Sequence, residues 1–180
     1  YNINEIKKIS ELCKNEGLAL HLDGARLWNA LELTQENPKV YGSLFDTISL
    51  CFSKGLGCPI GSVLVGSSNK IKEAIRIRKI FGGGMRQAGY LAAAGSYALL
   101  HNRKDLNNDH RRAKEIYECL NGLNFVKKVQ PVETNIIIFS LNKNLNEEKF
   151  IKDLRDKKIL IMGLGKGKLR IVTHRNYTQD

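Results

Sequence analysis

The sequence contains no apolar run that approaches the roughly 20 residues needed to cross a membrane as a helix. It also lacks internal repeats, low-complexity segments, and a basic stretch followed by an apolar stretch near its start. Aromatic residues make up only 7% of the chain, which disfavours a surface built to stack nucleic-acid bases. We therefore expect a folded, soluble protein with no membrane partner.

Cysteine occurs four times and never as a Cys-x-x-Cys pair, at Cys13, Cys51, Cys58 and Cys119. A chain of 180 residues can bury a core of ordinary domain size, so it needs no disulfide to fold. We expect reduced thiols and hence a cytoplasmic protein. His21, Asp23 and His174 could be drawn as a two-histidine, one-carboxylate iron site, but the two histidines are far apart in the sequence and we expect no metal.

Acidic residues are the minority charge, because 18 Asp and Glu face 29 Lys and Arg and leave a formal net charge of +11 at pH 7. Such a surplus suggests an anionic partner. A nucleic-acid-binding module is one interpretation. The basic residues, however, are spread from Lys7 to Arg175 instead of being clustered, so we expect no nucleic-acid partner.

Helical and strand patterns alternate along the chain, which predicts an α/β fold. Apolar residues at helical spacing predict a first helix at 2–16, and Gly17 is suited to end it. Short apolar runs predict buried strands at 18–22 and 47–52, and further strands are predicted at 61–65, 135–141, 159–162 and 168–173. Further helices are predicted at 69–80, 85–101, 102–120 and 146–157. The pattern changes near 121–129, so we expect part of a large domain over 1–125 and a small domain over 126–180.

Two glycine-rich segments invite comparison with phosphate-binding loops. Residues 163–168 read Gly-Leu-Gly-Lys-Gly-Lys, but no Ser or Thr follows the lysine and a strand comes next, so we favour a hairpin or tight connection. Residues 82–84 are three consecutive glycines, which could approach a phosphate through backbone N–H groups or serve as a hinge between helices.

Asp23 and Lys54 each stand at the end of a predicted apolar strand. Ligands of α/β folds bind at the carboxyl ends of strands, so an acid and an amine placed in this way could meet on one small molecule. A lysine amine shielded from water can form a Schiff base with an aldehyde. Taken alone, the two residues fit a helix cap and a loop lysine better.

Four segments change that balance: HLDGARLWNA (21–30), SLCFSKGLGCPIGSVLVG (49–66), RKIFGGGMRQAGYLAAAG (78–95) and LRIVTH (169–174). In this order and spacing the chain resembles the threonine aldolases of the β-eliminating lyase superfamily. These are pyridoxal-phosphate (PLP) lyases of the aspartate-aminotransferase fold, fold type I. The resemblance extends over nearly the whole chain, and it implies the C-terminal part of such an enzyme.

The resemblance also implies roles for individual residues. Lys54 matches the lysine that forms the Schiff base with PLP, and Asp23 matches the acid that pairs with the pyridinium nitrogen. The two arginines that match those binding the substrate carboxylate are Arg26 and Arg170. Basic residues expected near the cofactor phosphate or the entrance of the site are Lys79 and Arg86. A solvated basic helix face is the alternative for Lys79.

The reaction implied is the cleavage of L-threonine or L-allo-threonine to glycine and acetaldehyde, a step of threonine catabolism and glycine biosynthesis. A homodimer or homotetramer is implied as well. Complete family members are about twice as long, and their first half supplies a phosphate loop and a histidine that stacks on the cofactor. We therefore expect a fragment truncated at both ends that is weakly active or inactive alone. The nearest alternative is an aromatic-amino-acid β-eliminating lyase of the same fold.

Overall fold

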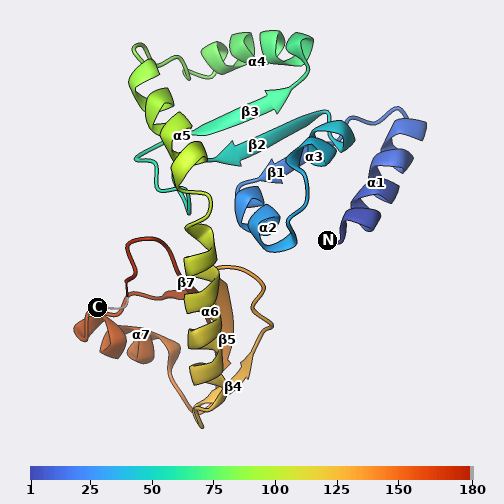
Figure 1. Ribbon diagram of the computed structural model, residues 1–180. Helices are drawn as coiled ribbons and strands as arrows, with labels where there is room; N and C mark the ends of the chain where they lie inside the picture. The colour runs from blue at the N-terminus through green and yellow to red at the C-terminus, as the bar shows by residue number, and fades with distance from the viewer. Residues whose placement is uncertain (179–180) are drawn as a thin grey trace. The chain divides into compact units, whose positions relative to one another are not determined.

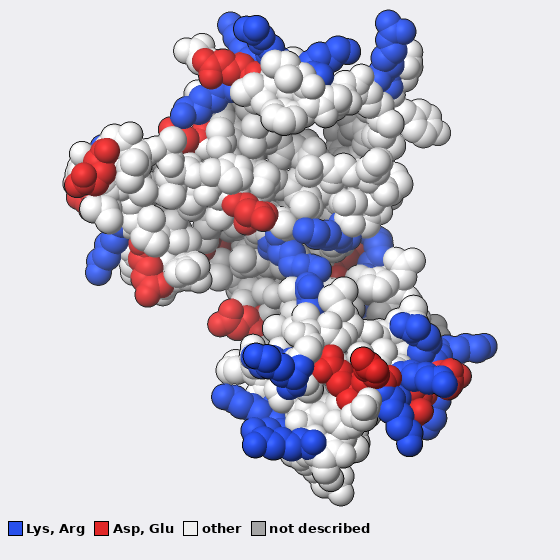
Figure 2. Space-filling view, turned by 180° about the vertical axis from the view of Figure 1, so that it is seen from behind, with Lys and Arg blue, Asp and Glu red and all other residues white. Residues whose placement is uncertain are grey.

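A computed structural model describes residues 1–178, and the chain divides into two compact units, one of residues Tyr1–Lys104 and a second that begins at Asp105 (Figure 1). Helices and strands occur in both units, so the expected α/β class is confirmed. Basic side chains lie on the surfaces of both units (Figure 2). Within residues 1–178 no helix combines the length and apolar character that crossing a membrane requires.

The N-terminal unit is built around a three-stranded sheet. In chain order it contains α1 (Ile3–Asn15), β1 (His21–Gly24), α2 (Leu27–Thr34), α3 (Pro38–Leu44), β2 (Thr47–Cys51), β3 (Ser62–Gly66), α4 (Ser68–Ile80) and α5 (Gly89–His101). The strand order is β1-β2-β3, with β1 parallel to β2 and β3 antiparallel to β2. Because β1 and β2 are parallel neighbours, their carboxyl ends lie at the same edge of the sheet.

Asp46 fixes the opposite edge of that parallel pair. Its carboxylate accepts a hydrogen bond from the backbone N–H of Leu20 at 2.8 Å, and it forms an ion pair with the Lys70 ammonium at 3.0 Å. The pKa of the Asp46 carboxyl is lowered, chiefly by the hydrogen bond from the Leu20 N–H and then by the Lys70 ammonium. The start of β2 is thus joined both to the segment before β1 and to helix α4.

The core of the N-terminal unit centres on Leu31, Tyr41 and Ile48, against which the apolar sides of α1 and α2 pack. Strand β3 confirms the strand predicted at 61–65, but its apolar residues Val63, Leu64 and Val65 are all exposed. All five residues of β3 are exposed, so residues 1–178 leave both faces of this apolar strand largely uncovered.

The C-terminal unit packs two helices against a four-stranded antiparallel sheet. It contains α6 (Leu106–Asn121), β4 (Val126–Val129), β5 (Ile136–Leu141), α7 (Glu147–Asp156), β6 (Met162–Gly165) and β7 (Lys168–Val172). The strand order is β4-β5-β7-β6. Ile137, Phe139 and Leu169 point to one face of this sheet and form the core with apolar residues of α6 and α7. By alternation, Ser140, Lys168 and the neighbouring even-numbered residues point to the other face.

Most expected elements are present, with shifts at their ends. The first strand begins at His21, later than predicted, because Gly17, at φ 65°, ends α1 and the Leu18 N–H bonds to the Cys13 carbonyl at 2.8 Å. In the same way, the strand predicted at 159–162 is wrong and β6 starts at Met162. Lys158, at φ 64°, and the bond from the Ile159 N–H to the Leu154 carbonyl (2.9 Å) close α7 there.

Helices α2 and α3 and strand β4 are absent from the sequence prediction. Helix α3 is short and begins with a proline. The structure places Pro38 in the first turn, after the cap residue Asn37, a position where proline is well tolerated. The hairpin expected at 163–168 is confirmed, since β6 and β7 pair through a two-residue turn.

The expected domain boundary between residues 125 and 126 stays a prediction. The compact units divide after Lys104, so α6 belongs to the second unit.

Candidate active site

Asp23 and Lys54 are positioned by the two parallel strands. Asp23 pairs in register with Ser49 near the carboxyl end of β1, and Lys54 follows the last residue of β2 by three positions. Because β1 and β2 are neighbours, both side chains come from the same edge of the sheet. The Asp23 Oδ1 atom accepts a hydrogen bond from the N–H of Ala25 at 3.1 Å, which fixes a turn directly after the strand. Asp23 is therefore not the cap of α2, whose cap residue is Arg26.

The loop that carries Lys54 is held by buried contacts on both sides. The N–H groups of Phe52 and Ser53 donate to the carbonyl of Gly61 at 2.9 and 3.3 Å and close the base of the loop. The side-chain amide of Asn102 donates to the carbonyl of Leu56 at 2.8 Å in a buried environment. These bonds fix the backbone on either side of Lys54, whose own side chain is exposed. The apolar surroundings that the sequence suggested for its amine are thus not supplied by residues 1–178.

Asn102 is a residue that sequence reasoning missed. It caps the C-terminal end of α5 and lies 46 positions from Leu56, the residue whose carbonyl it binds. No local pattern identifies such a contact. Cys58, in the same loop, is buried, and burial raises the pKa of its thiol, so this cysteine is suited to packing and not to nucleophilic chemistry.

Gly24, next to Asp23, stands at a position where only glycine fits. It is buried, and a Cβ atom there would lie 2.8 Å from the backbone oxygen of Ser49. Glycine therefore lets β1 approach β2 closely at the level of the acid. Two residues later, Arg26 is half-buried at the start of α2, on the same short connection as Asp23.

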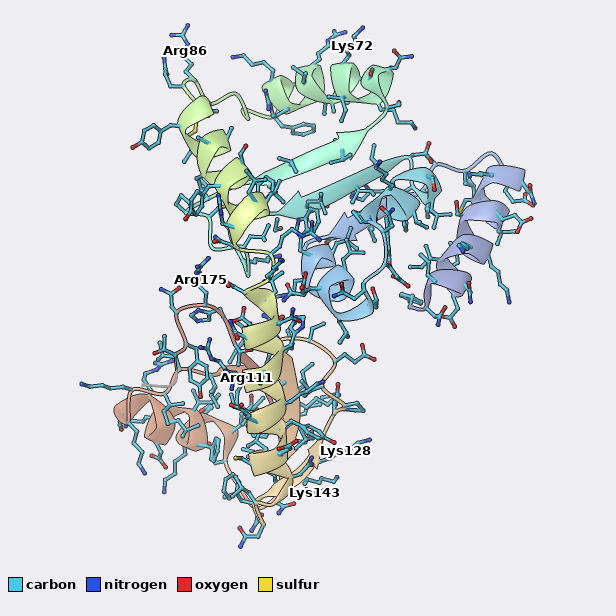
Figure 3. The ribbon with its side chains drawn as sticks, viewed as in Figure 1. Lys72, Arg86, Arg111, Lys128, Lys143 and Arg175 are labelled. Atoms are coloured by element: carbon cyan, nitrogen blue, oxygen red, sulfur yellow. The ribbon has the colours of Figure 1, made fainter. Side chains whose placement is uncertain are left out.

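Lys79, near the end of α4, and Arg86, before the start of α5, flank the three glycines between these helices. Arg86 is labelled in Figure 3. Lys79 lines a cavity of about 520 Å³, together with Lys72, Arg76, Arg78 and Gly84. The ammonium of Lys79 would lie only 3.2 Å from a Cβ atom at position 84, so glycine leaves room for it. Arg86 is exposed. The structure thus brings Lys79 into a basic cavity beside the glycine turn, while Arg86 points outward from it.

Arg170 belongs to the C-terminal unit, on β7, where it pairs in register with Ile138 and Met162. Its side chain is half-buried, and within residues 1–178 its Nε atom is buried without a hydrogen-bond partner. A buried guanidinium nitrogen that lacks an acceptor suits the binding of an anion. The other five predicted site residues all belong to the N-terminal unit.

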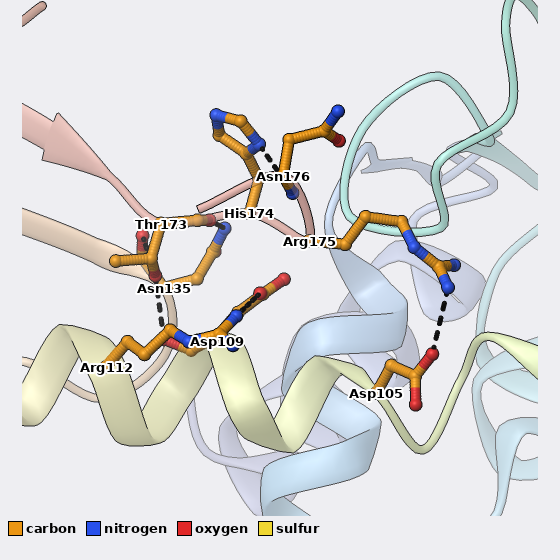
Figure 4. Close-up of polar contacts among 8 residues, drawn as sticks. All are labelled: Asp105, Asp109, Arg112, Asn135, Thr173, His174, Arg175 and Asn176. Atoms are coloured by element: carbon orange, nitrogen blue, oxygen red, sulfur yellow. Dashed lines mark hydrogen bonds and ion pairs between the residues drawn. The ribbon is translucent and has the colours of Figure 1, made fainter. Parts of the chain in front are cut away.

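The end of β7 is anchored by buried polar contacts (Figure 4). The Thr173 hydroxyl donates to the carbonyl of Asp109 at 2.7 Å, and the Asn135 amide donates to the carbonyl of Thr173 at 2.8 Å. Burial raises the pKa of the Asp109 carboxyl, although Arg112 lies 3.9 Å away. These bonds fix the strand on which Arg170 lies.

The family model for the beta-eliminating lyases matches residues 1–144. The chain belongs to this family. Low-specificity L-threonine aldolase 1 of Arabidopsis thaliana is 39% identical over 180 residues, which cover 98% of this chain and 50% of that protein. The chain thus spans about half the length of this curated beta-eliminating lyase relative.

Solved structures place this beta-eliminating lyase in the expected fold. Leishmania major threonine aldolase superposes with a TM-score of 0.77 at 20% identity, covering 99% of this chain and 53% of that one. The histidinol-phosphate aminotransferase of Clostridium acetobutylicum gives 0.68 at 18% identity, covering 97% and 54%. At these identities the likeness concerns the fold alone, and it confirms the fold class expected from the four sequence segments.

The residues of this beta-eliminating lyase fit a PLP-type cofactor. An acid and an amine come from the same edge of the sheet, and a basic cavity lies beside the glycine turn. Within residues 1–178 no three His, Cys, Asp or Glu side chains gather in a way that could hold a metal ion. The Nδ1 atom of His21 is instead hydrogen-bonded to the Thr47 hydroxyl at 2.8 Å.

Proposed function

We propose that the chain carries the Schiff-base lysine and the pyridinium acid of a PLP-dependent threonine aldolase, which cleaves L-threonine or L-allo-threonine to glycine and acetaldehyde. The observation that carries this proposal is the placement of Asp23 and Lys54 at the carboxyl ends of adjacent parallel strands. The 39% identity to a low-specificity L-threonine aldolase supports the choice of substrate.

Each residue of the chain has a separate task in this proposal. The Lys54 amine would hold the cofactor, and the Asp23 carboxylate would keep its ring nitrogen protonated. When bound, PLP supplies an acceptor for the electrons released as the Cα–Cβ bond of the substrate breaks. The guanidinium groups of Arg26 and Arg170 bind the substrate carboxylate. Lys79, and Arg86 at the entrance, provide positive charge for the cofactor phosphate.

Two further features are proposed for the complete protein. We propose a homodimer or homotetramer, because α5 exposes Tyr90, Tyr97 and Leu100 to 88%, 61% and 79%, an apolar surface suited to a second copy of the chain. A cytoplasmic location is supported by the cysteines, all four of which are free thiols. Light scattering after gel filtration would measure the oligomeric state, and a monomer at micromolar concentration would contradict the first proposal.

Reductive trapping tests the site. The chain is incubated with PLP and reduced with borohydride, and the labelled peptide is identified by mass spectrometry. We expect the label on Lys54 and its loss in Lys54→Arg, whereas Lys7→Arg, at an exposed lysine of α1 that does not line the basic cavity beside the glycine turn, serves as the matched control and keeps it. Labelling spread evenly over surface lysines would contradict the assignment.

Product analysis separates the two candidate reactions. Acetaldehyde formed from L-allo-threonine supports the aldolase, and pyruvate formed from L-tyrosine or L-serine supports the aromatic β-eliminating lyase. Turnover is expected of the complete polypeptide. The present chain alone should be weakly active or inactive, since it spans about half the length of its aldolase relative.

A further inference from the structure

A second basic cavity lies in the C-terminal unit, at one end of its sheet. It has a volume of about 570 Å³, and the lysines that line it come from β4, from the loop after β5, from the β6–β7 turn and from the start of β7: Lys127, Lys128, Lys143, Lys166 and Lys168. Ser140 and Asn142 add polar groups, and no Asp or Glu lines it. Lys128 and Lys143 mark this end of the unit in Figure 3.

Strand register explains why polar residues from three strands meet there. Lys128 pairs with Ser140, and Ser140 pairs with Lys168, so the three residues form one row across β4, β5 and β7. Directly paired residues point to the same face of a sheet. That face is opposite to the core, because Phe139 and Leu169, which flank the row along their strands, are buried.

A β-bulge adds Lys127 to this row. The pairing moves two residues along β4, from Val126 to Lys128, while it moves one residue along β5, from Leu141 to Ser140. In a regular strand, Lys127 and Lys128 would point to opposite faces. The extra residue of a bulge disrupts that alternation, so both lysines can face the cavity.

The carboxylate of Glu147 does not neutralise the lysines of the cavity. Glu147 accepts hydrogen bonds from the backbone N–H groups of Gly165 and Gly167 at 3.1 and 2.8 Å, and so holds the turn that carries Lys166 and Lys168. Within residues 1–178 none of the five lysines forms an ion pair with a carboxylate. Their charges repel one another, and an anion in the cavity would relieve that repulsion.

We propose that this cavity, the lysine pocket, binds a small polyphosphate, either free or as the triphosphate of a nucleotide. Lysine ammonium groups bind phosphate oxygens as point charges, whereas the planar fork of arginine suits carboxylates, and no arginine lines the pocket. Its volume lies in the range of small-molecule sites. The absence of lining aromatic residues argues against stacked bases, and hence against single-stranded nucleic acid.

Calorimetric titration of the chain with inorganic tripolyphosphate tests the proposal, with ATP, inorganic phosphate and a short DNA duplex as further probes. We expect saturable binding of one tripolyphosphate per chain, similar binding of ATP and much weaker binding of monophosphate. Affinity should fall as salt is raised, because the contacts are electrostatic. The double variant Lys128→Gln/Lys168→Gln should bind tripolyphosphate about tenfold or more weakly.

The matched control is Lys152→Gln/Lys157→Gln, which changes the net charge by the same amount on α7 and the residue that ends it, outside the pocket. It should bind within about twofold of the parent chain. Lys166→Gly should fold as the parent chain does, because Lys166 has φ 56°, a conformation that glycine adopts freely. This variant should also bind tripolyphosphate more weakly. Equal loss in the control, tighter binding of the duplex than of tripolyphosphate, or no saturable binding would each overturn the proposal. None of these outcomes bears on Lys54.

Discussion

A methyl group added at Gly24 should destabilise the N-terminal unit and disturb the candidate acid beside it. In Gly24→Ala the new Cβ would lie 2.8 Å from the backbone oxygen of Ser49, 3.1 Å from a methyl of Leu50 and 3.2 Å from a methyl of Ile48. The first of these partners is backbone of the central strand β2, which cannot move aside as a flexible side chain can. Strand β1 must therefore shift away from β2 at the level of Asp23.

The change in the free energy of unfolding follows from two opposing effects. Overpacking of this kind costs about 1–3 kcal/mol. Replacing glycine by alanine returns about 0.4–1 kcal/mol, because the unfolded chain loses conformational freedom. The net loss in the free energy of unfolding should be about 1–2 kcal/mol, which lowers the Tm of a unit of this size by roughly 5–15 °C.

The assay uses Trp28, the single tryptophan of the chain, which lies in α2 directly after β1 and packs under the Arg103 guanidinium at 4.7 Å. Urea unfolding followed by its fluorescence reports the N-terminal unit. Gly42→Ala is the matched control: its Cβ would meet nothing within 4 Å inside helix α3, so it should be neutral or stabilise by up to about 1 kcal/mol. An unchanged urea midpoint for Gly24→Ala, or an equal loss in the control, would refute the reasoning.

Three further predictions concern the supporting structure. Phe139→Ala should lower the free energy of unfolding by about 3–5 kcal/mol in urea titrations followed by circular dichroism, because this core ring is 2% exposed; a loss below 1 kcal/mol would show that it is not packed as described. The pKa of Asp46 is lowered in the folded state, so its stabilisation is present above its unfolded pKa of about 4 and is lost as pH falls through the folded value. Asp46→Asn should therefore lower the Tm at pH 7 and flatten its decline below about pH 4; parallel profiles would contradict this. Asn102→Ala removes the donor to the buried Leu56 carbonyl and should cost about 1–3 kcal/mol and reduce reductive labelling of Lys54 by PLP; unchanged labelling would show that Asn102 does not position the loop.

Local sequence signals predicted the elements that depend on local contacts. Helix α1 was predicted almost to the residue, because its apolar spacing is regular and Asn2 and Glu5 form a capping box at its start. The edges of β1 and β6 were misplaced because single residues with positive φ decide where the preceding helices end. Gly17, before β1, is a residue type that commonly adopts positive φ, whereas Lys158, before β6, is not.

The candidate site likewise combines residues that the sequence indicates with contacts that only the fold creates. The resemblance of four segments to the threonine aldolases implies the roles of Asp23 and Lys54, and these roles stay a prediction. The glycine that lets the strands approach at Asp23 and the amide that fixes the Lys54 loop act across the fold, through Gly24 and Asn102. No pattern within either segment could have predicted these contacts.

By itself, the sequence determined the α/β class, the family and the chemical groups available for catalysis, because these depend on residue identity and short-range periodicity. Only the tertiary structure decided that β1 and β2 are parallel neighbours, so that the ends of two distant segments share one edge of a sheet. Likewise, lysines that are scattered over about 40 positions became one pocket only through strand pairing and the bulge at Lys127. The physical reason is that strand register is set by core packing and hydrogen bonds between residues far apart in the chain.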